Sequence, residues 1–236
     1  MEPNRSTYTQ VRETAFDAGL QKYMQRVYNV MAAGLVLTGF VAYVTSQTPA
    51  LFEAVHGTFL GIVIALAPLG IIFFGLTPRK VMSMSTAMVS GLYFLMTGLI
   101  GLSLSYIFLM YSGESIARVF FITAGMFAAT SIFGYTTKKD LSAMGSLMFM
   151  GLIGIIIAMI VNIFLQSSMM QFVISCVGVV CFTGLTAWDT QRIKETYQHS
   201  HGSEALTKMA TMGALSLYLD FINLFQFLLM LLGNRE

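Results

Sequence analysis

Long apolar runs separated by short charged groups dominate this sequence and restrict the folds open to it. Hydrophobic residues make up 56% of the 236 residues, only 10% are charged, and the mean hydropathy is +0.74. A helix needs about 20 apolar residues to cross the hydrocarbon core of a bilayer. The pattern therefore predicts an all-α integral membrane protein and excludes an ordinary soluble domain.

The charged groups divide the chain into seven predicted transmembrane helices. Leu141 to Trp188 contains no charge and is too long for one helix, so a short turn is expected at Gln166–Ser168. The transmembrane domain is predicted over residues 27–232, between an N-terminal tail (1–26) and a short C-terminal end (233–236). The predicted spans are Val27–Val44, Phe59–Leu76, Met84–Met110, Val119–Tyr135, Leu141–Leu165, Met170–Trp188 and Met209–Leu232.

The basic residues predict how the helices are oriented. With seven spans, eleven lysines and arginines fall on one side of the membrane, and two, Arg118 and Arg235, fall on the other. By the positive-inside rule, the N-terminus is expected in the cytosol and the C-terminus outside or in a lumen. The tail lacks the apolar core of a signal peptide, and the net charge of +2 without a basic stripe excludes a nucleic-acid partner.

Asp220 is the residue that most clearly suggests a function. It lies in the middle of the apolar run Ala214–Leu232, and an acid near the membrane midplane costs about 2.5 to 3.5 kcal/mol. Ser216 and Asn223 are predicted on the same helical face, four residues before and three residues after it, as a polar pore lining. Asp189, at the cytosolic end of the sixth span, is close enough in the predicted topology to meet Asp220.

Two carboxyl groups in contact at low dielectric cannot both ionise easily, so they tend to share one proton and titrate as a unit. Singly protonated, the pair holds the sixth and seventh helices together by a hydrogen bond. Fully ionised, it repels and offers oxygen ligands to a hard cation such as Ca²⁺. This chemistry predicts an ion gate and pH sensor formed by Asp189 and Asp220, which are also the tentative calcium ligands.

The sequence offers two alternative sets of basic partners for Asp189. Arg79 and Lys80 follow the second span on the predicted cytosolic side and could form a closed-state latch by pairing with Asp189, or they could act only as topology determinants. Alternatively, Asp189 could be an interfacial acid paired with Arg192, one helical turn further on. Asp220 could also make a purely structural hydrogen bond between helices.

Three segments resemble the Bax inhibitor-one, or transmembrane Bax-inhibitor-motif, family, and most closely its bacterial branch. They are Lys138–Ser142 (KKDLS), Ala187–Ile193 (AWDTQRI) and Ala214–Phe225 (ALSLYLDFINLF), and the similarity covers the chain from about Gly19 to the end. The sequence departs from the family pattern at Trp188, where many members have tyrosine.

The resemblance implies seven helices with the seventh central in the bundle. It also implies a pH-sensitive passive calcium leak, governed by an aspartate pair at positions that match Asp189 and Asp220. Calcium and protons would then be the transported and sensed ions, no cofactor would be tightly bound, and the membrane would be a bacterial inner membrane.

Other functions remain open at this stage. A regulatory protein that binds other membrane proteins, in stress responses or membrane-protein quality control, would use the tail before Gly19. Two acids on consecutive spans also occur in intramembrane aspartyl proteases, but the Gly-x-Gly-Asp and Pro-Ala-Leu motifs are missing, and no histidine lies inside a predicted span for a serine mechanism. We therefore expect no enzyme. An ion-coupled transporter would be distinguished by uphill flux.

Overall fold

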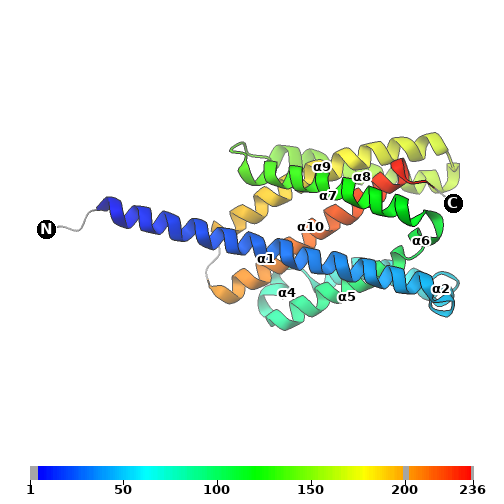
Figure 1. The fold of residues 1–236 in the computed structure, drawn as a ribbon, viewed down its shortest axis with the longest axis horizontal. Helices are drawn as coiled ribbons and strands as arrows, with labels where there is room; N and C mark the ends of the chain where they lie inside the picture. Colours follow the sequence, from blue (N-terminus) through cyan, green and yellow to red (C-terminus); the bar gives the residue numbers. More distant parts are fainter. Residues whose placement is uncertain (1–4, 199–201, 235–236) are drawn as a thin grey trace.

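The structure, a computed structural model, describes residues 5–198 and 202–234, and helices account for nearly all of them. Figure 1 shows them as an elongated bundle. In chain order the elements are α1 (Arg5–Gln47), α2 (Pro49–His56), α3 (Leu60–Gly70), the π-helical turn η1 (Ile71–Gly75), α4 (Pro78–Ser83), α5 (Thr86–Leu104), α6 (Ile107–Met110), α7 (Gly113–Thr136), α8 (Ser142–Leu165), α9 (Ser168–Gln198) and α10 (Ser203–Leu232).

The described residues contain six continuous helical spans and one bent pair. The continuous spans are Ala18–Gln47, Thr86–Met110, Gly113–Thr136, Ser142–Leu165, Ser168–Tyr197 and Ser203–Leu232, and the bent pair joins Pro49–His56 to Leu60–Gly75 at an angle of 71°. This confirms an all-α integral membrane protein, with a seventh span if the bent pair is counted as one.

The second predicted span, Phe59–Leu76, corresponds to the helical segment Leu60–Gly75, and the bend of 71° precedes it, between His56 and Leu60. The straight part, Leu60–Gly75, is about 24 Å long, which is less than the hydrocarbon thickness of about 30 Å. Pro68 lies inside α3, and the π-helical turn follows it, with the Leu76 amide donating to the Ile71 carbonyl over 2.8 Å. Pro68 and the π-helical turn change the backbone hydrogen bonding within this segment, which continues as a helix from Leu60 to Gly75.

The turn predicted at Gln166–Ser168 is confirmed. α8 ends at Leu165, Gln166 has a left-handed backbone with φ of 49°, and α9 begins at Ser168. The Asn162 side-chain oxygen accepts a hydrogen bond from the Ser167 amide over 3.0 Å, which satisfies a backbone donor inside the turn. A two-residue connection makes α8 and α9 antiparallel neighbours.

α10 is the central helix of the bundle, as predicted for the seventh span. Its membrane-spanning window is 61% buried, compared with 6% for α8. It packs against α1, α5, α7 and α9, and Tyr218 on it is fully buried and lies 2.6 Å from the Thr38 hydroxyl of α1. Any polar group on the inner faces of α10 is consequently surrounded by protein rather than lipid.

The N-terminus and the C-terminus lie at opposite ends of the bundle (Figure 1). The connections that carry Arg79 and Lys80, and Lys138 and Lys139, lie at the end that also holds the start of α1, and we call this the basic end. α1 begins at Arg5 and continues without a break into the first span, so the part of the predicted tail that the structure describes is helical. Residues 1–4 and Arg235 lie outside the described residues.

Gly134 allows α7 to approach α9 closely beside the polar part of the bundle. A Cβ atom at Gly134 would lie 2.2 Å from the backbone carbonyl oxygen of Ala187, two residues before Asp189. Backbone atoms of a packed helix cannot move aside as a flexible side chain can. The glycine therefore sets the separation of the two helices.

We predict that Gly134→Ala lowers the unfolding temperature of the purified protein, because the added methyl group pushes α7 away from α9. Gly125→Ala is the matched control, since the same change on the same helix meets no atom within 4 Å. Thermal unfolding of both variants in the same detergent measures the difference. Equal unfolding temperatures would show that this contact does not determine the packing.

Candidate functional site

Asp189 on α9 and Asp220 on α10 meet inside the bundle. Their carboxyl groups are in hydrogen-bonding contact, and the residues are only 7% and 5% exposed. Oδ2 of Asp220 is buried and receives no hydrogen bond from any N–H or O–H donor among the described residues. Two carboxylates have no hydrogen of their own to share, so a proton between them is what makes this contact favourable. We call these residues the aspartate pair.

Arg192 supplies the positive charge beside the aspartate pair. Its Nη2 lies 2.8 Å from Asp189 Oδ1 and donates to the Ser216 hydroxyl over 3.2 Å. The guanidinium also lies 4.7 Å from the centroid of the Trp188 ring, a cation–π arrangement. The Arg192 side chain is 48% exposed while that of Asp189 is 10% exposed, so the arginine forms the boundary between the buried acid and the outside.

A cavity of about 380 Å³ lies at the same place, between α1, α4, α9 and α10. Arg192 and Ser216 line it, so the group that pairs with Asp189 is also part of the cavity wall. We call this cavity the vestibule. The remaining lining residues are Tyr23, Val81, Met82, Ile193, Thr196, Met209, Met212 and Gly213.

Aromatic side chains close the bundle from Asp220 toward the opposite end. Phe221 follows Asp220 directly, and its ring centroid lies 5.5 Å from those of Phe120 and Phe127 on α7. Phe225, one turn further, lies 6.3 Å from Phe120. Phe221, Phe225 and Phe127 are buried, and we call these four residues the aromatic cluster. These rings fill the space between α7 and α10 with apolar surface.

Neighbours of Asp189 on α9 fix that helix against the rest of the bundle. Thr190 donates to the Ser131 hydroxyl of α7 over 3.3 Å. The buried Gln191 donates to the Lys139 carbonyl and accepts from the Leu141 amide, both over 2.8 Å. These bonds hold the α7–α8 connection to α9 next to the aspartate pair. Thr190 and Gln191 were not identified from the sequence, although polar side chains in an otherwise apolar run were the feature that indicated buried hydrogen bonds there.

The structure brings together some of the predicted site residues and separates others. Ser216 lines the vestibule, whereas the Asn223 amide donates to the Leu219 carbonyl of its own helix over 2.8 Å. The Lys80 ammonium donates to the Phe74 carbonyl over 2.8 Å, and Arg79 is exposed. The partner of Asp189 is therefore Arg192, as in the alternative reading of the sequence, and a latch by Arg79 or Lys80 stays a prediction.

Calcium would find few ligands at this site. Among the described residues, no group of three or more histidine, cysteine, aspartate or glutamate side chains comes together. Two carboxylates supply at most four of the six to eight oxygens that Ca²⁺ takes. The aspartate pair alone therefore cannot complete the coordination shell of a Ca²⁺ ion.

Comparison with known proteins places the chain among membrane proteins of the same length. A family model described as inhibitor of apoptosis-promoting Bax1 matches residues 20–236. The chain belongs to this family. Inner membrane protein YbhL of Escherichia coli K12 is 43% identical over 224 residues, covering 93% of this chain and 94% of YbhL. Uncharacterised proteins of Rickettsia prowazekii and Caulobacter vibrioides are 46% and 47% identical, covering 97% and 95% of this chain and 96% and 93% of theirs.

This family membership confirms the resemblance seen in the three sequence segments. Trp188, which lies in one of these segments, packs against both Arg192 and α8. Its ring lies under Arg192, and a Cβ atom at Gly145 of α8 would lie 2.3 Å from the ring. The glycine makes room for the large indole, which in turn supports the arginine that faces the aspartate pair.

We predict that the protein becomes less stable as the pH rises from 6 to 9. A pair that keeps a proton when folded binds more protons than the unfolded chain does. The free energy of unfolding therefore falls by about 1.4 kcal/mol per pH unit while the folded pair keeps a proton that the unfolded chain has lost, and it levels off once the pair releases that proton. In Asp220→Asn, an amide replaces the shared proton as the hydrogen-bond donor, so the unfolding temperature should lose this pH dependence.

Asp140→Asn is the control for this measurement. Hydrogen bonds from the Ser142 side chain and backbone lower the pKa of the exposed Asp140 carboxyl, so it stays ionised throughout the range tested. Thermal unfolding at several pH values should give parallel curves for this variant and the wild type. A pH dependence that persists in Asp220→Asn would show that the aspartate pair does not share a proton.

Proposed function

We propose that this protein is a pH-sensitive passive calcium leak in a bacterial inner membrane, with the aspartate pair as its gate. The observation that carries the proposal is the contact between two buried carboxyl groups from consecutive membrane helices. The name of YbhL as an inner membrane protein supports the location, and the distribution of basic residues supports a cytosolic basic end.

The arrangement around the pair supports a closed state with a defined order of barriers. From the basic end, an ion would first meet the vestibule with Arg192 in its wall, then the aspartate pair, and then the aromatic cluster. The positive guanidinium opposes a divalent cation, the shared proton occupies the carboxyl oxygens, and the phenyl rings offer no ligands. Each barrier has a different physical cause.

Release of the shared proton would open this path at the pair itself. Two charged carboxylates in contact repel each other, and the single positive charge of Arg192, which is half exposed and contacts Asp189 directly, cannot compensate both of them. Separation of α9 from α10 frees carboxyl oxygens for a hard cation and displaces Phe221, the residue next to Asp220. The proposed leak is therefore low at acidic pH and increases as the pH rises.

We predict that calcium entry into proteoliposomes containing the purified protein increases from pH 6 to pH 8. Asp189→Asn and Asp220→Asn should keep flux low at every pH, because a neutral amide cannot generate the repulsion. Asp140→Asn, an exposed acid outside the pair, is the control and should behave as the wild type does. A calcium indicator trapped inside the vesicles reports the flux.

Two results of this experiment would contradict the leak. One is flux no greater than in empty vesicles, and the other is an unchanged pH response in Asp220→Asn. Either result would make the aspartate pair a structural contact between helices. It would also favour the alternative role, in which the protein regulates other membrane proteins and the helical N-terminal extension of α1 is the segment placed to contact them.

We predict that Arg192→Gln raises the pH at half-maximal flux by about 1. Without its counter-charge the pair holds the shared proton more firmly, and the effect is at the lower end of the range for such contacts because Arg192 is 48% exposed. Maximal flux should also increase, since the vestibule loses a positive charge. Lys138→Gln is the matched control, with the same charge change on an exposed residue at the same end of the bundle. If the pH at half-maximal flux does not change, Arg192 takes no part in the gate.

A further inference from the structure

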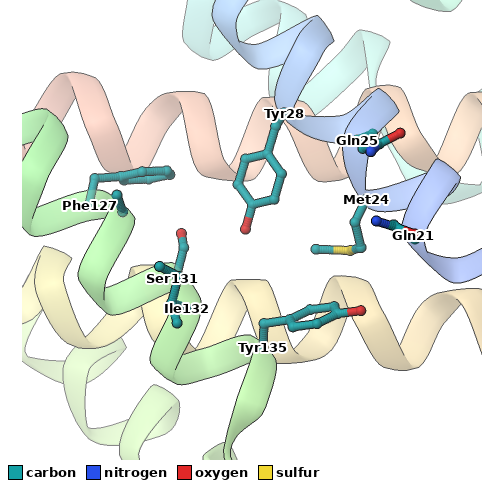
Figure 2. A pocket seen from close by; sticks show the side chains of 9 residues that line it. Gln21, Met24, Gln25, Tyr28, Phe127, Ser131, Ile132 and Tyr135 are labelled. Carbon is teal, nitrogen blue, oxygen red and sulfur yellow. The ribbon is translucent and has the colours of Figure 1, made fainter. Parts of the chain in front are cut away.

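A second, larger cavity lies away from the aspartate pair, between α1 and α7 (Figure 2). Its volume is about 630 Å³, which is within the range of cavities that hold small molecules. Figure 2 shows side chains from both helices pointing into the space between them. α1 contributes Gln21, Met24, Gln25 and Tyr28, and α7 contributes Phe127, Ala128, Ser131, Ile132 and Tyr135. We call it the α1–α7 cleft.

The cleft lies at one end of two membrane spans. Gln21 is close to the beginning of the span Ala18–Gln47, and Tyr135 is close to the end of the span Gly113–Thr136. Both positions belong to the basic end. Ile132 in the cleft wall is 64% exposed, so the cleft opens to the surroundings, which at this depth are the boundary between lipid chains and headgroups. A molecule that enters it sideways comes from the bilayer.

The lining has two chemical characters. Met24, Phe127 and Ile132 provide apolar surface, while the Gln21 and Gln25 amides and the Tyr28 and Ser131 side chains provide hydrogen-bonding groups. The exposed Gln21 and Gln25 amides can bind a polar group at the mouth of the cleft, while Met24 and Phe127 offer buried apolar surface. The occupant that matches both is an amphiphile with a hydrocarbon chain and a polar head.

Positive charge at the edge of the cleft favours an amphiphile with an anionic headgroup. The Lys194 ammonium donates to the Tyr135 carbonyl over 2.9 Å and lies 5.0 Å from the centroid of the same tyrosine ring. Tyr135 lines the cleft, and Lys194 is half-buried against it. A lysine at the membrane surface attracts anionic lipid, an effect of about 1 kcal/mol.

We propose that the α1–α7 cleft binds one anionic glycerophospholipid from the leaflet at the basic end. Its chain lies between Met24 and Phe127, and its phosphate lies beside Lys194. The bound lipid is also connected to the aspartate pair. Ser131 in the cleft wall accepts a hydrogen bond from Thr190, the residue after Asp189. A lipid between α1 and α7 therefore holds α7 against α9 at the level of the gate.

Native mass spectrometry of the purified full-length protein, mixed with phosphatidylglycerol or with phosphatidylcholine of the same chains, tests the proposal. We expect one tightly retained phosphatidylglycerol per chain. Lys194→Gln should weaken its binding by about fivefold, the equivalent of 1 kcal/mol. Ile132→Trp should block binding by filling the cleft, and its exposed position makes it compatible with folding. Lys138→Gln, with the same charge change in the exposed α7–α8 connection, should bind as the wild type does.

Three outcomes would overturn the proposal. Equal retention of phosphatidylcholine would remove the role of charge, and unchanged binding in Ile132→Trp would place the lipid elsewhere. Equal weakening in Lys138→Gln and Lys194→Gln would reduce the interaction to nonspecific surface attraction. The measurement does not depend on calcium flux, so its result is independent of whether the aspartate pair acts as a gate.

Discussion

A contact between two carboxyl groups inside an apolar bundle is the constraint on which the rest of this structure depends. Asp189 and Asp220 are both buried, and the proton that joins them must come from outside the protein. Elsewhere α9 and α10 are held by apolar packing such as that of Phe182 on Phe227, so the aspartate pair is the place where their contact depends on protonation. Arg192 reduces the cost by facing Asp189, but it does not remove the requirement, because Asp220 lies deeper in the bundle.

The two sides of the aspartate pair differ in chemistry. Toward the basic end lie hydroxyl and guanidinium groups and the vestibule, and toward the other end lies the aromatic cluster. Asp220 and Phe221 are adjacent in the sequence, so α10 cannot move the acid without moving the ring. In the proposed leak, ionisation of the pair would thereby be linked to displacement of the aromatic cluster, and the central helix α10 carries both groups.

The transmembrane helices and the two acids, Asp189 and Asp220, could be predicted from the sequence, whereas the cavities and contacts around the acids could not. Hydropathy located the spans because each must cover about 30 Å of hydrocarbon, and it did not predict the short helix Pro49–His56, which meets Leu60–Gly75 at 71°. Asp220 was evident because an acid in an apolar run is costly. The vestibule and the α1–α7 cleft were not predictable, since both lie between helices that are distant in sequence. Arg192 had a local signal in its spacing of three residues from Asp189.

Arg192 is where the local and the long-range constraints meet. Its charge is useful to Asp189 only if the guanidinium stays over a buried acid instead of turning toward water, and half of its surface is exposed. The Trp188 ring supports it from below and Ser216 receives one of its hydrogen bonds, so the side chain is held from both α9 and α10. Trp188 in turn fits only because Gly145 lacks a side chain. The charge balance at the aspartate pair is therefore determined by packing between α8 and α9 as well as by the ionisable groups themselves. A smaller ring in place of Trp188 would hold the arginine less firmly beside Asp189.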